Sequence, residues 1–473
     1  MVRLPGELDA SDGAQSASSL VERLVAVRSN LGRQLAASWN VPLGEYLASL
    51  IPRARIGPAN VHLRLLSRAL ERYLVARREV GIDDVCELLL ARPVIQQSDH
   101  ANLLLDAETF VNNFLFHIAA ARQSLPVAIH SQCTTVSCIT RRSPIRGPVF
   151  LWTRGRCYRT LPFSNRRLAN SSFCALPSPT TFRFLTIDGG VRPHGDALLE
   201  ALDGGPVTDP SDAYRHANAS IWSSLAVSHD VRRVAVDERL SSEAIAMHLE
   251  DPTSPIGRLI FDPGVRDVFV RVKRRLVASR VNLTVNRAAP DFFWWREGTE
   301  LRAIVLEGNG SSARFVLEVN GAAIAALDNA TSTSAALRRG DLYGDRILAY
   351  LVRCLLPGVV AVGGTVQQDY VELYRRMLIE THRQVPFLDA ADILRLQDPN
   401  LTRLGGAPLV ELDVATKEEI SWLGPHTSLT GMAERMLGVP LSRSIGMMRC
   451  AWFYDALLDR QARQQSDEAE CGA

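Results

Sequence analysis

The chain has 473 residues, 47% of them hydrophobic and 22% charged, which is the composition of a globular protein with ample material for a core. Its 53 basic and 51 acidic residues leave a net charge of +2, so the charge balance favours neither a nucleic-acid nor an acidic-membrane partner. Arg353 and Pro357 interrupt the longest apolar stretch, which leaves it short of the roughly 20 residues of a membrane-spanning helix.

Only two of the 53 basic residues are lysines, Lys273 and Lys417, and this rarity argues against two classes of enzyme. No Gly-Lys-Ser or Gly-Lys-Thr occurs, so the chain has no Walker phosphate loop. A pyridoxal-phosphate enzyme binds its cofactor through a lysine. Both lysines stand among charged neighbours, where we expect exposed amines, and the sequence therefore points to no particular cofactor.

The N-terminus and the cysteines indicate a cellular compartment. Residues 1–17 lack the basic start and apolar stretch of a secretory signal, and their small and acidic residues predict a disordered tail. The 8 cysteines are scattered over the chain rather than concentrated in a small disulfide framework. We expect reduced thiols and a cytoplasmic protein.

Residues 18–90 are predicted to form a helical N-terminal region. Leu63, Leu66, Leu70 and Leu74 recur at helical spacing, with arginines on the opposite side. Prolines separate the successive helices.

An α/β pattern begins at residue 91. The apolar residues 93–95 and 126–130 predict buried strands, and residues 107–123 between them have the helical period. The polar residues 96–106 are predicted to form a loop after the first strand. Strand, helix and strand within roughly 40 residues make a βαβ unit, which is the start of a parallel sheet.

Antiparallel strands are predicted farther along, as a β meander over residues 292–328. Its aromatic start, Phe292 to Trp295, fits a core strand better than a ligand-stacking site. Asn-Gly and Gly-Asn-Gly sequences between short apolar runs are typical of hairpins. The strand-like runs of the meander are 301–306, 314–319 and 322–327, and two earlier ones are 148–152 and 181–187.

A second α/β unit follows the meander. Residues 339–356 are predicted to form a helix, 359–362 a buried strand and 367–383 a further helix. Gly363-Gly364 is the tight turn between the strand and the last helix.

The expected fold class is therefore α/β. A Rossmann-like core with a parallel or mixed sheet spans residues 91–385 and contains the inserted antiparallel β meander. Residues 18–90 and 386–473 form helical N- and C-terminal sections.

Polar residues follow the first predicted strand, where α/β sheets bind ligands. Asp99 and His100 are the predicted general acid–base pair. Gln96, Gln97 and Asn102 are predicted to bind substrate. The alternative is that these side chains only cap the next helix.

His130 and Cys133 lie at the end of the next predicted strand, and hence at the same edge of the sheet. They are predicted catalytic residues, with Cys133 as nucleophile and His130 as base. A binding loop without covalent chemistry is the alternative. His100, His117 and Cys138 add further zinc-type ligands, but the spacing matches no zinc template, so we predict no metal site.

Arginines and amides between the two α/β units are candidates for binding an anion, because the guanidinium fork pairs with carboxylate and phosphate groups. A solvated loop surface is the alternative. The predicted substrate-binding residues are Arg141, Arg142, Asn165, Arg166 and Arg167.

Gly363 and Gly364 allow a ligand to approach the N-terminus of the helix that follows them. With Gln367 and Tyr370, they are predicted to bind substrate, whereas a tight turn without a ligand is the alternative. The chain contains no Gly-x-Gly-x-x-Gly after a strand, no Gly-x-Ser-x-Gly and no His-Glu-x-x-His.

Four short segments of the two α/β units form a recognisable pattern: Val94-Ile95-Gln96-Gln97, Leu103-Leu104-Leu105, Leu125-Pro126-Val127-Ala128 and Val362-Gly363-Gly364 followed by Tyr370. The pattern resembles the cysteine-adding enzymes of bacillithiol biosynthesis. Ile95 stands where that family has glycine, and the family's Glu-Asp-His-Asp is His130-Ser131-Gln132-Cys133 here. The resemblance implies a Rossmann-like core that joins small polar metabolites.

We therefore expect an enzyme of small-molecule biosynthesis, a group transferase or ligase that joins or modifies a small, anionic, amino-acid-like substrate. Neither a nucleic acid nor a membrane is an expected partner, and a homo-oligomer is compatible with the sequence. Two alternatives stay open: a non-catalytic ligand-binding or accessory subunit, and a metal-dependent hydrolase.

Overall fold

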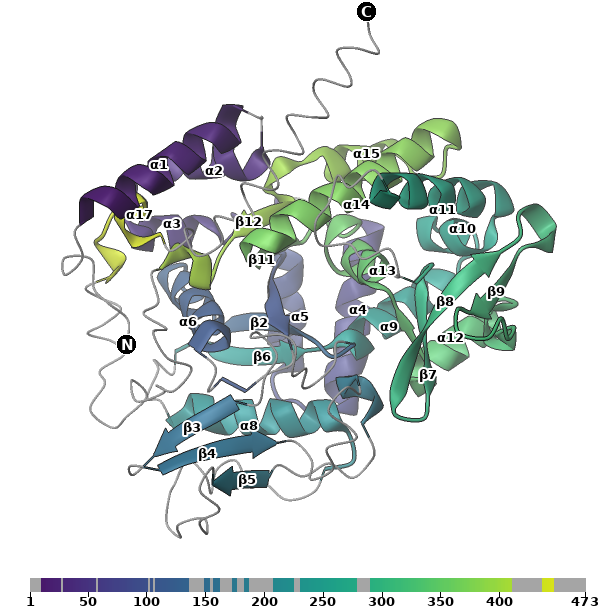
Figure 1. The fold of residues 1–473 in the computed structure, drawn as a ribbon, viewed down its shortest axis with the longest axis horizontal. Coiled ribbons are helices and arrows are strands. Elements are labelled where there is room, and N and C mark those ends of the chain that lie inside the picture. Colours follow the sequence, from purple (N-terminus) through teal and green to yellow (C-terminus); the bar gives the residue numbers. More distant parts are fainter. Residues whose placement is uncertain are drawn as a thin grey trace, which may run out of the picture.

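The computed structural model of the chain is shown in Figure 1. It describes residues 10–26, 29–56, 58–100, 103–104, 107–135, 149–153, 156–161, 172–176, 183–186, 207–224, 230–278, 290–410 and 436–445.

A five-stranded parallel sheet lies at the centre of the fold, with its strands in the order β12-β11-β1-β2-β6. This order reverses between β1 and β11, as it does in doubly wound α/β folds. The predicted α/β class with a parallel core is confirmed. The strands are β1 (Val94–His100), β2 (Val127–Cys133), β6 (Arg232–Val236), β11 (Val360–Gly363) and β12 (Thr402–Leu404).

Alternate side chains of the central strands enter two separate cores. In β2, Ala128 packs with apolar residues of α6 (Ala107–Arg122), which connects β1 to β2. Ile129 joins the other core, to which α14 (Thr365–Gln384) contributes. Both faces of the sheet are apolar because strand side chains alternate and helices cover both sides.

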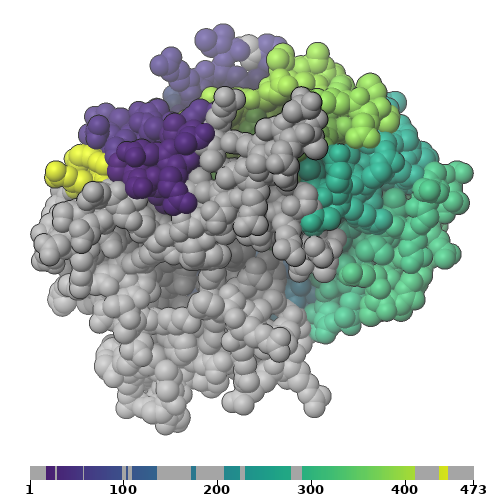
Figure 2. Space-filling view, turned by 45° about the horizontal axis from the view of Figure 1, so that its top comes forward, coloured from purple at the N-terminus to yellow at the C-terminus, as the bar shows by residue number. Residues whose placement is uncertain are grey.

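The predicted N-terminal helices are present and contribute to both cores. Helices α1 to α3 belong to the core on the α6 side, and α4 and α5 to the core on the α14 side. Helix α1 begins at Ala10, within the segment predicted to be a disordered tail. It packs beside α17 (Leu441–Ser444), and Figure 2 shows the two in purple and yellow. The bounds are α1 (Ala10–Ala26), α2 (Asn30–Ser38), α3 (Leu43–Ser49), α4 (Val61–Ala76) and α5 (Ile82–Ala91).

Two antiparallel sheets accompany the parallel sheet. The larger has the order β10-β7-β8-β9 and contains the predicted meander. Residues 322–327 are not the expected third strand, since only a single bridge joins Ala323 to Val316 and a short 3-10 helix follows. The smaller sheet has the order β3-β4-β5. The strands are β3 (Val149–Thr153), β4 (Arg156–Leu161), β5 (Arg183–Thr186), β7 (Phe293–Glu297), β8 (Glu300–Glu307), β9 (Arg314–Leu317) and β10 (Leu342–Gly344).

Three predictions about element boundaries are wrong. β1 continues to His100, so Gln96 to His100 extends the strand between β11 and β2 instead of forming a loop. β10 interrupts the helix predicted for 339–356, because Gly340 adopts a φ of 77° and ends the preceding helix. β12 lies inside the section 386–473 that was predicted to be helical.

The remaining helices surround the strands, and none of those in the described residues has the length and apolar composition needed to cross a membrane. A π-helical turn, η5 (Leu351–Leu355), continues α13. The helices are α8 (Pro210–Ser224), α9 (Glu238–Leu249), α10 (Pro255–Phe261), α11 (Pro263–Ala278), α12 (Ala330–Arg339), α13 (Arg346–Tyr350) and α15 (Ala390–Gln397).

Lys273 is buried, contrary to the exposed amine that we predicted. Its residue is only 3% exposed, and its Nζ donates a hydrogen bond to the carbonyl oxygen of Pro290. The same atom lies 3.5 Å from Asp291 Oδ1 and 3.6 Å from Asp345 Oδ2. The charge of the sequence neighbours does not predict the exposure of Lys273, because adjacent residues on a helix point in different directions.

Candidate functional site

The carboxyl ends of β1, β2 and β11 lie at one edge of the sheet. Gln96 pairs in register with Val362 of β11 and with His130 of β2, and His100 pairs with Cys133. Doubly wound sheets bind ligands outside this edge, where the strand order reverses. The two strand-end clusters and the Gly-Gly turn therefore belong to the same region of the molecule.

Gln96 and His130 belong to the face covered by α6 and are part of the interior. His130 Nδ1 lies 3.3 Å from Gln96 Oε1, and its ring contacts Phe116 edge-on at 5.3 Å. Burial, reinforced by Arg233, lowers the pKa of His130 well below its ordinary value. The imidazole is therefore neutral at physiological pH. The predicted pairing of His130 with Cys133 is wrong, because residues three apart in a strand point to opposite faces.

Cys133 instead lies beside Glu238, the first residue of α9. The Glu238 carboxylate accepts hydrogen bonds from the Thr134 backbone N–H, at 2.5 Å, and from the Thr134 hydroxyl. Burial raises the pKa of Glu238, although Arg353 and the two hydrogen bonds oppose the shift. Burial and the neighbouring Glu238 also raise the pKa of the Cys133 thiol to about 11. A carboxyl group with a raised pKa is suited to proton transfer near neutral pH.

Arg346, Tyr350 and Arg353 form a stripe along α13 and η5. Their spacing of four and then three residues brings them to the same side of the helix. Arg353 is 4% exposed, its guanidinium lies 5.9 Å from the Tyr350 ring centroid, and its Nη1 donates to the Ser131 hydroxyl of β2. Arg346, by contrast, is exposed. The π-helical turn that carries Arg353 is a feature often found at functional sites.

Tyr370, in the second turn of α14, connects this stripe to β1. Its ring lies 5.1 Å from the Arg346 guanidinium, and its hydroxyl is 2.8 Å from that of Tyr350. The Tyr350 hydroxyl in turn donates to the backbone oxygen of Gln97, at 3.4 Å. The Gln97 side-chain amide donates to Cys354 Sγ at 2.8 Å. We refer to the following residues as the carboxyl-edge cluster: Cys133, Thr134, Glu238, Arg346, Arg353 and Tyr370.

Positive charge exceeds negative charge within the carboxyl-edge cluster. Neither Arg346 nor Arg353 has a carboxylate oxygen within 4 Å in the described part of the chain, where the other buried and half-buried cations mostly form ion pairs. Glu238 is the one carboxyl group of the cluster, and it acts on Arg353 from a greater distance. Arg346 lies over the Tyr370 ring and also interacts with the Tyr374 hydroxyl, which leaves the other donors of its guanidinium for an anion.

The Gly-Gly turn lies beside the cluster, between β11 and α14. A Cβ atom at Gly363 would collide with the side chain of Gln367, whose Nε2 donates to the Ala361 carbonyl at 3.2 Å. Gln367 is therefore directed back toward β11. Gly364 is the N-cap of α14.

The other predicted site residues are not placed. The backbones of Asp99 and His100 belong to the end of β1, but their side chains lie outside the described residues. The remaining predicted substrate-binding residues lie wholly outside them: Asn102, Arg141, Arg142, Asn165, Arg166 and Arg167.

The zinc-type residues do not gather around one point in the described ranges. His117 contacts Trp222 edge-on at 5.2 Å, and Cys138 is outside those ranges. No group of three His, Cys, Asp or Glu side chains suited to a metal ion occurs among the described residues.

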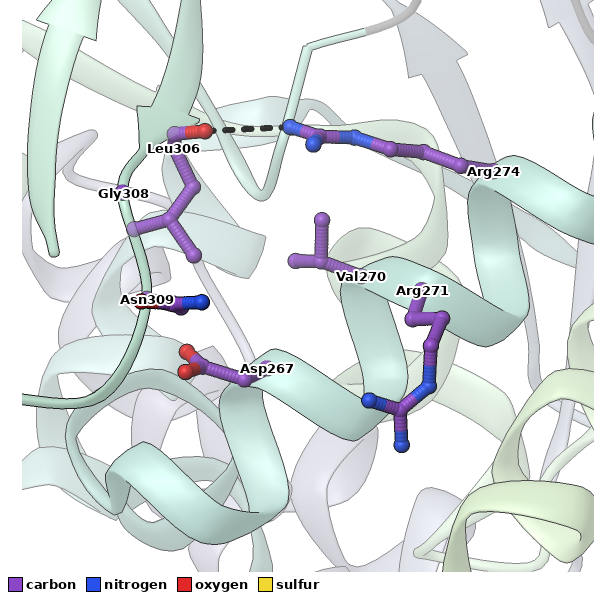
Figure 3. Close-up of a pocket in the computed structure, with 7 residues that line it drawn as sticks. All are labelled: Asp267, Val270, Arg271, Arg274, Leu306, Gly308 and Asn309. Carbon is purple, nitrogen blue, oxygen red and sulfur yellow. Dashed lines mark hydrogen bonds between the residues drawn. The ribbon is translucent and has the colours of Figure 1, made fainter.

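A separate hollow of about 280 Å³ lies between α11 and the turn after β8 (Figure 3). There Arg274 pairs with Asp291 at 2.6 Å and donates to the Leu306 carbonyl at 3.1 Å. Asp267 pairs with Arg266 at 3.0 Å. Arg271, which also lines the hollow, donates to Gln384 Oε1 at 3.3 Å. Two of the three charged side chains of this hollow are thus already paired with opposite charges, which makes it a weaker candidate than the carboxyl-edge cluster.

Three residues of the cluster, Glu238, Arg346 and Arg353, were missed at the level of sequence. Arg353 was noted only because it interrupts an apolar stretch, yet a cation within an apolar helix is itself a sign of a buried polar role. Glu238 follows the run Val234 to Val236, which has the pattern of a short strand ending in carboxylates.

No protein-family model matches the chain, and no curated protein matches it significantly. The geometry of the described residues is therefore the basis for a functional proposal.

Proposed function

We propose that the protein is an enzyme of small-molecule metabolism, a group transferase or ligase acting on a small, anionic, amino-acid-like substrate. The substrate binds at the carboxyl-edge cluster, outside β1 and β2. The proposal agrees with the local resemblance to enzymes that join small polar metabolites.

One observation carries the proposal. Arg346 is an exposed residue whose guanidinium has no carboxylate within 4 Å in the described chain, and it acts on Cys133, which lies beside the buried carboxyl of Glu238. A cation held against Tyr370 loses little freedom when it binds a carboxylate. A second buried cation, Arg353, adds to the attraction for anions.

In this proposal, Arg346 binds the substrate and Glu238 transfers the proton. Arg346 holds the substrate carboxylate through paired hydrogen bonds. Glu238, oriented by Thr134, exchanges a proton with the reacting group, and its raised pKa keeps this exchange possible near neutral pH. Asp99 and His100 are proposed to assist from the end of β1, and Cys133 to contact the substrate.

Binding is tested with the Arg346→Gln variant. Thermal shift with the twenty L-amino acids and with succinate identifies a ligand of the wild type, and calorimetry measures its Kd. Losing a charge-assisted pair worth about 2 kcal/mol weakens binding roughly 30-fold. Arg302→Gln, on the remote strand β8, is the matched control and keeps wild-type affinity. A wild type that binds no member of the panel, or an Arg346→Gln variant with unchanged affinity, would refute the proposal.

Catalysis is tested separately, once a ligand is known. The protein is incubated with that ligand, each other amino acid and ATP, and products are sought by mass spectrometry. Glu238→Gln and His100→Ala are expected to retain the ligand but lose turnover. Binding without any product would favour a non-catalytic accessory subunit.

A further inference from the structure

The N-terminus of α14 lies at the point where the order of the sheet reverses. This helix has 20 residues, and its N-cap, Gly364, provides no side-chain hydrogen bond to the first turn. The first backbone N–H groups of a helix have no partner within the helix, and they carry a partial positive charge. In α14 the Gln367 N–H donates to the Gly364 carbonyl at 3.2 Å, so the N–H groups of Thr365 and Val366 are the donors left at this helix end, outside β11.

The described part of the chain leaves the space beside this helix end open. A Cβ atom at Gly364 would meet no described residue within 4 Å. The backbone there is extended, with φ −72° and ψ 178°, which any residue can adopt. Backbone strain therefore does not explain the glycine, whereas close approach by a bound group does.

Gln368 is an independent sign of a ligand at the same place. It is only 8% exposed, yet neither its Oε1 nor its Nε2 has a hydrogen-bond partner among the residues that the structure describes. Gln368 follows Gly364 by four residues, so both lie on one side of the helix, and helical side chains lean toward the N-terminus. This lean brings the Gln368 side chain toward the first turn of α14, which begins after Gly364. Buried amides without partners are rare in proteins.

We propose that the N-terminus of α14, with Gly364 and Gln368, binds a phosphate group of a phosphorylated co-substrate. The N–H groups of the first turn contact the phosphate oxygens, and Gln368 donates to them from Nε2. This phosphate site needs no lysine, which agrees with the absence of a Walker phosphate loop from the sequence. Its role as a co-substrate site rests on the proposed function. Tyr370, two residues beyond Gln368 on α14, connects the same helix to Arg346.

Calorimetry with pyrophosphate and with ADP tests this inference, and the key variant is Gly364→Asp. Aspartate is a preferred N-cap, so we expect the Tm to stay equal or rise. Its carboxylate occupies the helix end and repels phosphate, so pyrophosphate binding weakens at least tenfold. Gln368→Glu acts in the same way. Gly438→Asp, at an exposed glycine with open space around it, adds the same charge elsewhere and leaves binding unchanged.

The outcomes separate this site from the carboxyl-edge cluster. Arg346→Gln is expected to reduce amino-acid binding but not pyrophosphate binding. ADP that binds more tightly than pyrophosphate identifies a nucleotide as the source of the phosphate. Failure of the wild type to bind either probe at 10 mM, or unchanged binding by Gly364→Asp, overturns the inference. Loss of pyrophosphate binding in Arg346→Gln alone assigns the phosphate to the cluster and also overturns it.

Discussion

Replacing the buried Lys273 by methionine removes the cation that two buried carboxyl groups share. Asp291 keeps a partner, because Arg274 lies 2.6 Å from its Oδ2. Asp345 loses the only cation within 4 Å of it in the described chain, although it is only 4% exposed. Its pKa is already raised by burial even with Lys273 beside it. The variant therefore leaves Asp345 as an uncompensated buried charge.

Removing one partner of a buried ion pair costs about 3–5 kcal/mol. At roughly 2 °C per kcal/mol for a large chain, the Tm of Lys273→Met is expected to fall by about 6–10 °C. The defect depends on pH. A carboxyl whose folded pKa lies above its unfolded pKa favours the folded state at low pH and opposes it at high pH. The Tm difference from the wild type is therefore expected to shrink as the pH falls from 8 to 5.

Scanning fluorimetry from pH 5 to pH 8 measures these effects, and Asp345→Asn provides the matched control. Asparagine keeps the N-cap hydrogen bond that Asp345 accepts from Leu348, at 2.9 Å, but carries no charge. Lys273→Met combined with Asp345→Asn is expected to regain about half of the lost stability. A Lys273→Met variant with a wild-type Tm, or a double variant less stable than the single one, would show that the ion pair does not support this core.

Two further predictions concern titrating groups. Because the pKa of Cys133 is about 11, its reaction with iodoacetamide at pH 7.5 should be at least 100-fold slower than that of free cysteine. The reaction should be faster in the Glu238→Gln variant. Mass spectrometry of the Cys133 peptide measures the labelling, and rapid labelling in the wild type would contradict this prediction. Burial, together with His62, lowers the pKa of His248 to about 3. His248 therefore takes up a proton when the protein unfolds below pH 6.5. We expect the free energy of unfolding to fall by about 2 kcal/mol between pH 6.5 and pH 5. His248→Phe should reduce that loss in urea titrations, and an identical loss in both proteins would rule out His248 as its source.

Local patterns were sufficient to predict the βαβ start of the sheet, the Gly-Gly turn and most of the meander. They failed for β12, because a strand of 3 residues has too few positions to show a period. They also failed for the end of β1, where the polar residues Asp99 and His100 stand in a strand because β2 pairs with them.

The candidate site was predictable in position but not in composition. The sequence placed polar residues at the ends of β1 and β2, and the fold brings those ends together. Whether His130 or Glu238 lies beside Cys133 depends on which face of the sheet each side chain enters and on where α9 begins after β6. Sequence distance carries no information on this, since Glu238 is far from Cys133 along the chain.

By itself, then, the sequence determined the α/β class, the sheet edge with its Gly-Gly turn, and the lack of a lysine-based phosphate loop, because these depend on residue type and short-range period. Tertiary structure alone decided the strand order, the burial of Lys273 and the approach of Glu238 and Arg346 to Cys133. Those features arise from contacts between distant segments, whose free energy comes from packing and desolvation and leaves no local pattern.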